Sequence, residues 1–128
     1  MKIQNEVIDL SGTGKKFVAV MVNKSYKPYF TLFQTYECAR TCWHVDLNNV
    51  KKPDYILAVY YGKIVGVFTA TAWLDGHSTE NSIIKNKKEK EKRYEFVGKI
   101  VKGKFAQQLI GCEILGYEKK GYPIQYFN

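Results

Sequence analysis

The stretch from Tyr55 to Trp73, YILAVYYGKIVGVFTATAW, constrains the fold more than any other part of this sequence. Both of its apolar arms are rich in Val, Ile, Tyr, Phe and Thr, whose branched or ring-bearing side chains fit a pleated surface better than a helix. Gly62 and Lys63 lie between the arms, where a tight turn is needed. The stretch therefore predicts a β-hairpin within a sheet protein.

Other segments also have the pattern of regular structure. The continuous apolar run KFVAVMV, at 16–22, predicts a buried strand. The best helix lies at 31–44, where Thr31 is a candidate N-cap and apolar residues recur every three or four positions. The remaining predictions are an alternating strand at 93–101, one or two helical turns at 104–111, and a final edge strand in GYPIQYFN.

This order of elements predicts an α+β fold with a mainly antiparallel sheet, one main helix and a short second helix. A sheet of aromatic and β-branched residues buries its inner face by curling, which predicts a partly open β-barrel. We expect a single domain over 1–128, because a chain that is 45% hydrophobic can fill one core at this length. Within it, the densely charged stretch 74–92 predicts a solvated, flexible insertion.

The chain carries an excess of positive charge, with 20 Lys and Arg against 12 Asp and Glu and a net charge of +8. This balance favours a polyanionic partner. Only Arg40 and Arg93 are arginines, so lysines supply most of the charge and attract phosphate without reading base edges. The alternative is a surface whose lysines only keep the protein in solution.

The sequence gives no indication of a membrane or of an oxidising compartment. Its apolar runs are too short to span a bilayer, and MKIQNEVIDL lacks the basic and apolar segments of a signal peptide. The 3 cysteines cannot all pair within one chain. We therefore expect a cytoplasmic protein without a membrane partner.

Residue types that catalyse reactions or bind metals do not combine into a recognisable site. Cys38, Cys42 and His44 have zinc-ligand chemistry, but His44 would point away from Cys42 around a helix. The loop LDGHSTE at 74–80 places Asp, His and Ser too close together to converge as a triad. We therefore expect no catalytic residues, no cofactor and no metal, and an enzyme that processes nucleotides is only the third interpretation.

Aromatic residues give a stronger indication of a site. Around the helix end, the hairpin and the third strand lie Trp43, Tyr60, Tyr61, Trp73, Tyr94 and Phe96. Stacking of a base on an aromatic ring is worth ~1–3 kcal/mol. Because successive strand residues face opposite sides, Tyr60 and Tyr61 are expected on opposite faces. We expect Trp73 or Trp43 in a pocket, and Phe68 and Phe96 in the core.

Four segments together resemble the PUA-like superfamily, which includes the ASCH, EVE and YTH domains, and within it a group of small bacterial domains. They are Cys42-Trp43-His44 at the helix end, Pro53-Asp54 before YILAV, the run KIVGVFTA from Lys63, and the strand RYEFVG from Arg93. The resemblance covers residues 15–128. It implies a pseudo-barrel with a cleft between helix and sheet, where several members hold RNA or a modified base. By position, it places Arg40 and Trp43 on one side of the cleft and the hairpin residues Tyr60, Tyr61 and Trp73 on the other.

The sequence therefore predicts a module that binds RNA, single-stranded or modified nucleic acid, or a nucleotide-like ligand. The planar group is expected among Arg40, Trp43, Tyr60, Tyr61, Trp73 and Arg93, and the phosphates on Lys85, Lys87 and Lys88. The alternative is a protein-interaction module that uses the aromatic patch as a hot spot for a partner protein.

Overall fold

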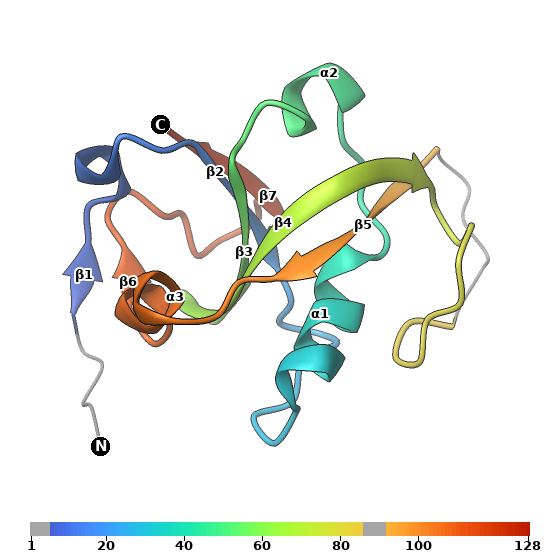
Figure 1. The fold of residues 1–128 in the computed structure, drawn as a ribbon, viewed down its shortest axis with the longest axis horizontal. Helices are drawn as coiled ribbons and strands as arrows, with labels where there is room; N and C mark the ends of the chain where they lie inside the picture. Colours follow the sequence, from blue (N-terminus) through green and yellow to red (C-terminus); the bar gives the residue numbers. More distant parts are fainter. Residues whose placement is uncertain (1–5, 86–91) are drawn as a thin grey trace.

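The computed structural model describes residues 6–85 and 92–128, and its fold is α+β, as predicted. The elements in chain order are β1 (Val7–Ile8), the 3₁₀ helix η1 (Leu10–Thr13), β2 (Phe17–Met21), α1 (Leu32–Arg40), α2 (Leu47–Val50), β3 (Tyr55–Tyr60), β4 (Lys63–Asp75), β5 (Tyr94–Ile100), α3 (Lys104–Leu109), β6 (Glu113–Ile114) and β7 (Ile124–Phe127) (Figure 1). The main helix is α1. Within the described ranges, no helix is long and apolar enough to cross a membrane.

The strands form one mixed sheet in the order β1-β6-β4-β3-β2-β7, and β5 also pairs with β4. β2 and β3 are parallel, as are β1 and β6, whereas the other pairs are antiparallel. The mainly antiparallel prediction missed the parallel β2–β3 pair, because α1 and α2 carry the chain back to the start of its neighbouring strand. The pairings of the described residues end at β1 and β7, so they form an open sheet and not a closed barrel.

The predicted hairpin is confirmed, since β3 and β4 pair antiparallel from Ile56–Phe68 to Tyr60–Lys63. Its turn lies one residue earlier than predicted, at Tyr61 and Gly62, whose φ angles are 46° and 85°. Two consecutive residues with positive φ are the feature of the type I′ turn, which suits a two-residue hairpin. The backbone N–H of Tyr61 donates to Oδ1 of Asn23 at 2.8 Å, which holds this non-glycine residue in the turn.

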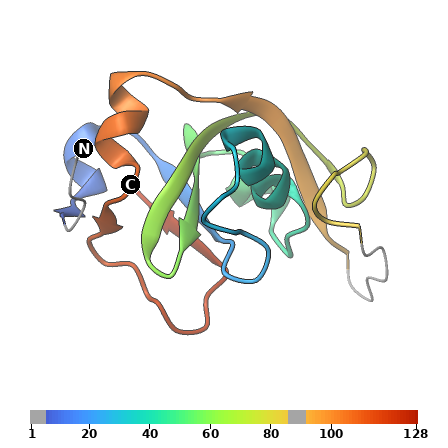
Figure 2. The same cartoon turned by 90° about the horizontal axis from the view of Figure 1, so that it is seen from below.

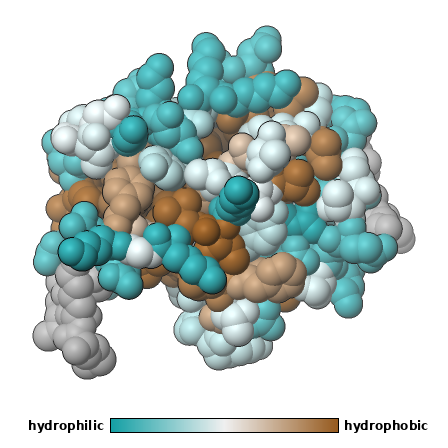
Figure 3. All heavy atoms as spheres, in the orientation of Figure 1, coloured by the Kyte–Doolittle hydropathy of each residue, from teal (hydrophilic) through white to brown (hydrophobic). Residues whose placement is uncertain are grey.

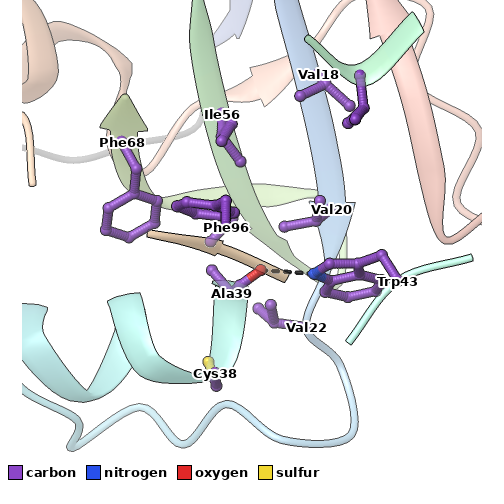
Figure 4. Packing of buried hydrophobic residues seen from close by; sticks show 11 residues of the cluster. Val18, Val20, Val22, Cys38, Ala39, Trp43, Ile56, Phe68 and Phe96 are labelled. Atoms are coloured by element: carbon purple, nitrogen blue, oxygen red, sulfur yellow. Dashed lines mark hydrogen bonds between the residues drawn. The ribbon is translucent and has the colours of Figure 1, made fainter. Parts of the chain in front are cut away.

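The central strands are buried on both faces and separate two hydrophobic cores. Even-numbered residues of β2, such as Val18, face the core under α1, whereas odd-numbered residues, such as Phe17, face the core that includes α3. Figure 4 shows the first of these cores, which contains Phe68 and Phe96 as predicted. The uninterrupted apolar runs of the sequence reflect this burial on both sides.

Helix α1 begins as predicted, with Thr31 as its N-cap in a capping box, but it ends at Arg40 and not at His44. Beyond it, the backbone of Trp43 exchanges two hydrogen bonds of 2.8 Å with Tyr94 of β5. A residue bonded to a strand in this way cannot continue a helix, so the apolar spacing overestimated the helix length. Figure 2 shows α1 against the curved sheet, with β5 running alongside it.

The charged stretch predicted as a flexible insertion starts inside β4, which extends to Asp75. The chain beyond the strand then attaches to α1. Nδ2 of Asn81 donates to the carbonyl oxygen of Glu37 at 2.7 Å, and the N–H of Ser82 donates to Oε1 of Glu37 at 3.1 Å. Short polar residues such as Asn and Ser are typical of loops, so the sequence predicts no contact for them. In the structure they bind α1 at Glu37, which lies 44 and 45 positions earlier in the chain. Residues 86–91 lie outside the described residues.

Candidate functional site

A hollow of about 530 Å³ lies where the end of β2, the hairpin turn and the start of β5 meet. It brings together three residues that the sequence analysis predicted for the site, Trp43, Tyr61 and Arg93. The other residues that line it are Met21, Asn23, Lys24, Ser25 and Pro123. We call it the Trp43 hollow. Its volume lies within the range of roughly 300–1,000 Å³ that is typical of small-molecule sites.

Trp43 forms a fixed wall of this hollow. Its indole Nε1 donates to the carbonyl oxygen of Ala39 at 2.6 Å, which Figure 4 shows as a dashed line. Its backbone is held by the two bonds to Tyr94, and the residue is only 9% exposed. An aromatic ring held in this way loses little conformational freedom when a ligand packs against its accessible part.

Tyr61 is the exposed aromatic residue of the Trp43 hollow, with 65% of its surface accessible. Its ring packs edge-on against Tyr60 with the centroids 4.8 Å apart, and Tyr60 in turn lies 4.8 Å from Tyr26. The prediction that Tyr60 and Tyr61 lie on opposite faces was wrong, because Tyr61 is in the turn, where strand alternation no longer applies. Tyr61 therefore presents an accessible ring that its neighbours support from one side.

The charged groups that line the Trp43 hollow are cationic. Lys24 is exposed and Arg93 is half-buried, and none of the described residues that line this hollow is acidic. The carbonyl oxygen of Arg93 accepts a hydrogen bond of 2.8 Å from the N–H of Gly76, which fixes the backbone at this position. The side chains of Lys24 and Arg93 give the lining its positive charges, and positive charges in a lining attract anionic ligands.

Arg40, which the resemblance places at the cleft, is buried in a polar network instead. Its Nε lies 2.5 Å from Oε2 of Glu37, and its Nη1 donates to Oε2 of Glu95 at 3.2 Å and to Oγ1 of Thr79 at 2.6 Å. Its Nη2 donates to the carbonyl oxygen of Glu80. A buried guanidinium needs such partners, because an unpaired charge in the interior is costly. In this arrangement Arg40 links α1 to β5 and to the chain after β4, and it does not line the Trp43 hollow.

Trp73 lines a different hollow, of about 410 Å³, which we call the Trp73 hollow. Its walls come from β4 around Ala72 and Trp73 and from the chain around Pro53. No residue lines both this hollow and the Trp43 hollow. The two tryptophans that the sequence offered as alternatives for one pocket therefore belong to two separate hollows.

The predicted phosphate-binding lysines are not at the Trp43 hollow as far as the structure describes them. Lys85 lines a hollow of about 270 Å³ beside His77 and Asn81. Lys87 and Lys88 lie outside the described residues. At the Trp43 hollow itself, Lys24 is the lysine in place.

The burial of Cys38 agrees with a packing role for this thiol. Cys38 is buried, and its Sγ lies 3.2 Å from the carbonyl oxygen of Thr35. Burial raises the pKa of the Cys38 thiol to about 11, against a smaller opposing effect of a hydrogen bond with Ser25. A thiol that stays protonated at neutral pH is a weak nucleophile and a weak metal ligand. In residues 6–85 and 92–128, no group of three or more His, Cys, Asp and Glu is arranged to hold a metal ion.

Part of the lining is not among the residues predicted from the sequence. A binding role could have been predicted for the polar loop directly after the buried strand, where binding residues often lie; this loop contains Asn23, Lys24 and Ser25. No sequence pattern predicts such a role for Met21 or Pro123. They meet through the hydrogen bond from the N–H of Met21 to the carbonyl oxygen of Pro123, 2.9 Å long, which no local pattern reveals.

No protein-family model matches this sequence, and neither a curated protein nor a solved structure matches the chain. The structure itself describes an α+β protein with an open mixed sheet. A hollow lined by cationic and aromatic residues lies at one end of its central strands.

Proposed function

We propose that this protein binds a nucleotide-like ligand, or an unpaired nucleotide of a nucleic acid, in the Trp43 hollow. One observation carries the proposal: Trp43, Tyr61, Arg93 and Lys24 come from four separate segments and line the same hollow. Aromatic rings beside cations suit a ligand that combines a planar base with a phosphate. The net charge of +8 attracts the same class of ligand over a longer range.

In this proposal, different residues of the Trp43 hollow bind the base and the phosphate of the ligand. The base stacks on the accessible ring of Tyr61, and Trp43 provides the rigid wall. Lys24 and Arg93 bind the phosphate. Bases stacked inside a duplex offer no free face to a side chain, so the ligand is a free nucleotide, a single strand or a flipped nucleotide.

We also infer that the chain is a PUA-like domain. The support is the four sequence segments that resemble the superfamily, together with a curved sheet that carries the main helix on one face (Figure 2). In this proposal the open sheet corresponds to a partly open barrel, and Trp43 is the cleft residue at the helix end. The ligand class proposed for the hollow agrees with what several members of that superfamily bind.

Fluorescence titration tests the proposal directly. The chain contains 2 tryptophans, so the Trp73→Phe variant leaves Trp43 as the single reporter. Single-stranded RNA, single-stranded DNA, mononucleotides and modified nucleosides are added at roughly 50 and 200 mM salt, a range in which phosphate contacts weaken measurably. We expect saturable quenching that weakens with salt for at least one class. Absence of quenching by all of them would overturn the proposal.

A matched pair of tyrosine variants locates the binding. Tyr61→Ala removes the stacking ring and is expected to weaken binding by about tenfold or more, in line with ~1–3 kcal/mol for one stacked base. Tyr29→Ala removes a tyrosine that is 78% exposed but does not line the Trp43 hollow, so binding is expected to stay unchanged. Equal losses in both variants would assign the binding to general surface contacts.

A second candidate function, protein interaction, is favoured by one specific observation. Tyr29, Leu32 and Phe33, at the start of α1, are 78%, 40% and 56% exposed. Exposed apolar residues gathered in this way mark interaction surfaces. Binding of a partner that persists at about 200 mM salt, is lost in Phe33→Ser and is retained in Tyr61→Ala would favour this function over the first.

A further inference from the structure

The Trp73 hollow lies along the second half of β4, and one of its walls is the edge of that strand. β3 pairs with β4 only up to Ile56 and Phe68, and from Ala70 to Asp75 β4 pairs with β5 on its other side. Among the described residues, no strand pairs with the edge that remains. Alternate residues of a strand direct their N–H and C=O groups to each side, so this edge presents backbone donors and acceptors.

The pairing of β4 is also interrupted next to the hollow. The register with β5 shifts between Ala70 and Ala72, so Thr71 has no partner in it. Such a bulge bends the strand and frees the backbone groups of one residue. Ala70, Thr71 and Ala72 all line the hollow. The strand edge is therefore irregular and accessible where the hollow is.

Trp73 adds a buried polar group that lacks a partner. Its indole Nε1 is inaccessible to solvent and has no hydrogen-bond acceptor within the described part of the chain. Buried N–H groups are almost always bonded, so this one favours an occupant that brings an acceptor. Nε1 of Trp43, by contrast, already donates to Ala39. The indole N–H of Trp43 is thus hydrogen-bonded and that of Trp73 is not bonded to any described residue, a difference that the indole resonances in NMR spectra can distinguish.

The opposite wall suits apolar side chains. Val50, Pro53 and Ile56 line it, and Figure 3 shows hydrophobic surface among hydrophilic side chains in the region of α2. Lys51 is exposed at the rim. The acidic residue of the lining, Asp54, already accepts a hydrogen bond of 2.9 Å from the N–H of Lys16. The rim therefore carries a positive charge, on Lys51, and a negative charge, on Asp54.

We propose that the Trp73 hollow binds an extended peptide segment of a partner protein, which adds as a strand to the free edge of β4. The backbone of the segment pairs with β4, as in other cases of strand addition. Its alternate side chains lie on the apolar wall, and its charged or polar side chains meet Lys51 and Asp54 at the rim. A small turn of the Trp73 side chain brings the buried Nε1 to a carbonyl oxygen of the segment. This function is independent of ligand binding in the Trp43 hollow, because the two hollows share no residue.

The test begins with a phage-displayed library of random heptapeptides, selected on the folded protein. Enriched peptides are expected to alternate β-branched with polar residues. A synthetic copy is then titrated into ¹⁵N-labelled protein, and the two indole N–H resonances are followed, with Trp73 assigned by the Trp73→Phe variant. We expect the Trp73 resonance to shift saturably as it gains an acceptor, while that of Trp43 stays in place. Failure of the library to yield a binder that shifts Trp73 would overturn the proposal.

Matched variants separate strand addition from other contacts. Ala70→Leu fills the hollow and is expected to weaken peptide binding at least tenfold, whereas Gln107→Leu, at an exposed position of α3, is not. A peptide N-methylated at alternate residues is expected to bind at least tenfold more weakly, because it cannot pair with the strand edge. Unchanged binding in Ala70→Leu, or of the N-methylated peptide, would contradict the proposal. A Trp73 shift caused only by single-stranded RNA, or only by raised protein concentration, would instead assign the hollow to nucleic acid or to a second copy of the chain.

Discussion

Arg40 and Glu95, 55 positions apart in the sequence, form a buried ion pair at the end of α1, with Nη1 of Arg40 3.2 Å from Oε2 of Glu95. Their side chains are 5% and 0% exposed. Nε of the same guanidinium lies 2.5 Å from Oε2 of Glu37, so one cation serves two carboxylates. The N–H of His77 donates to Oε1 of Glu95 at 2.7 Å. The pair thus joins α1, β5 and the chain after β4, close to the segment that positions Trp43.

Replacing Arg40 by Met is expected to lower the free energy of unfolding by about 3–5 kcal/mol, because it leaves buried carboxylates without their cation. Urea denaturation measures the loss. The control is Lys92→Met, which breaks an ion pair of 2.9 Å with Asp75 on the surface and is expected to change stability little. Similar losses in the two variants would show that the buried network does not hold this region together.

Gly98 of β5 lies directly against the backbone of β4. A Cβ built at this position would lie 1.8 Å from the carbonyl oxygen of Thr69, whereas one built at Gly12 meets nothing within 4 Å. Gly98→Ala is therefore expected to cost at least about 2 kcal/mol of unfolding free energy through overpacking, and Gly12→Ala much less. Thermal unfolding followed by circular dichroism compares the two. Equal melting temperatures would mean that the strand pair can open to accept the methyl group.

The parts of the fold that the sequence predicts correctly are those set by local chemistry. β-branched and aromatic residues indicate the β3–β4 hairpin, and Thr31 indicates the N-cap of α1. The parallel pairing of Phe17 with Tyr55 depends instead on where the intervening chain returns, which no window of the sequence contains. The two-residue strands β1 and β6 are too short to have a periodic signal at all.

The residue types of the candidate site were predictable from the sequence, but their arrangement was not. The sequence indicates aromatic residues and cations, and three of the predicted residues, Trp43, Tyr61 and Arg93, do line one hollow. Arg40 lies on the same helix face as apolar residues, and its pairing with Glu95 depends on β5. From the sequence alone, that arginine therefore looks free to bind a ligand. Whether a side chain is exposed or paired is decided by neighbours that are distant in the chain.

The buried thiol of Cys38 makes stability depend on pH in alkaline solution. Burial raises its pKa from the ordinary value of 9.0 to about 11, so the unfolded chain loses this proton first. The contribution is fully present below pH 9 and is lost as the pH rises toward 11, which amounts to a loss on the order of 2–3 kcal/mol. Denaturation at pH 8 and pH 10.5 is expected to show the decrease, and Cys38→Ala to reduce it. Burial also raises the pKa of Tyr26, so Tyr26 adds to the alkaline loss of stability in the wild-type protein and in Cys38→Ala. An unchanged pH dependence in Cys38→Ala would place the titrating group elsewhere.

The salt dependence of ligand binding measures how many cations at the Trp43 hollow contact phosphate. Each phosphate contact with a single strand adds about 0.7 to the slope of log K against log salt concentration. Lys24→Gln is therefore expected to weaken oligonucleotide binding and to reduce that slope by slightly less than 1. Lys102→Gln, at an exposed position outside the hollow, is the matched control and is expected to change neither quantity. The two slopes are measured by fluorescence titration of the Trp73→Phe protein. A weaker complex with an unchanged slope would mean that Lys24 contacts the base or supports the loop, and that Arg93 alone meets the phosphate.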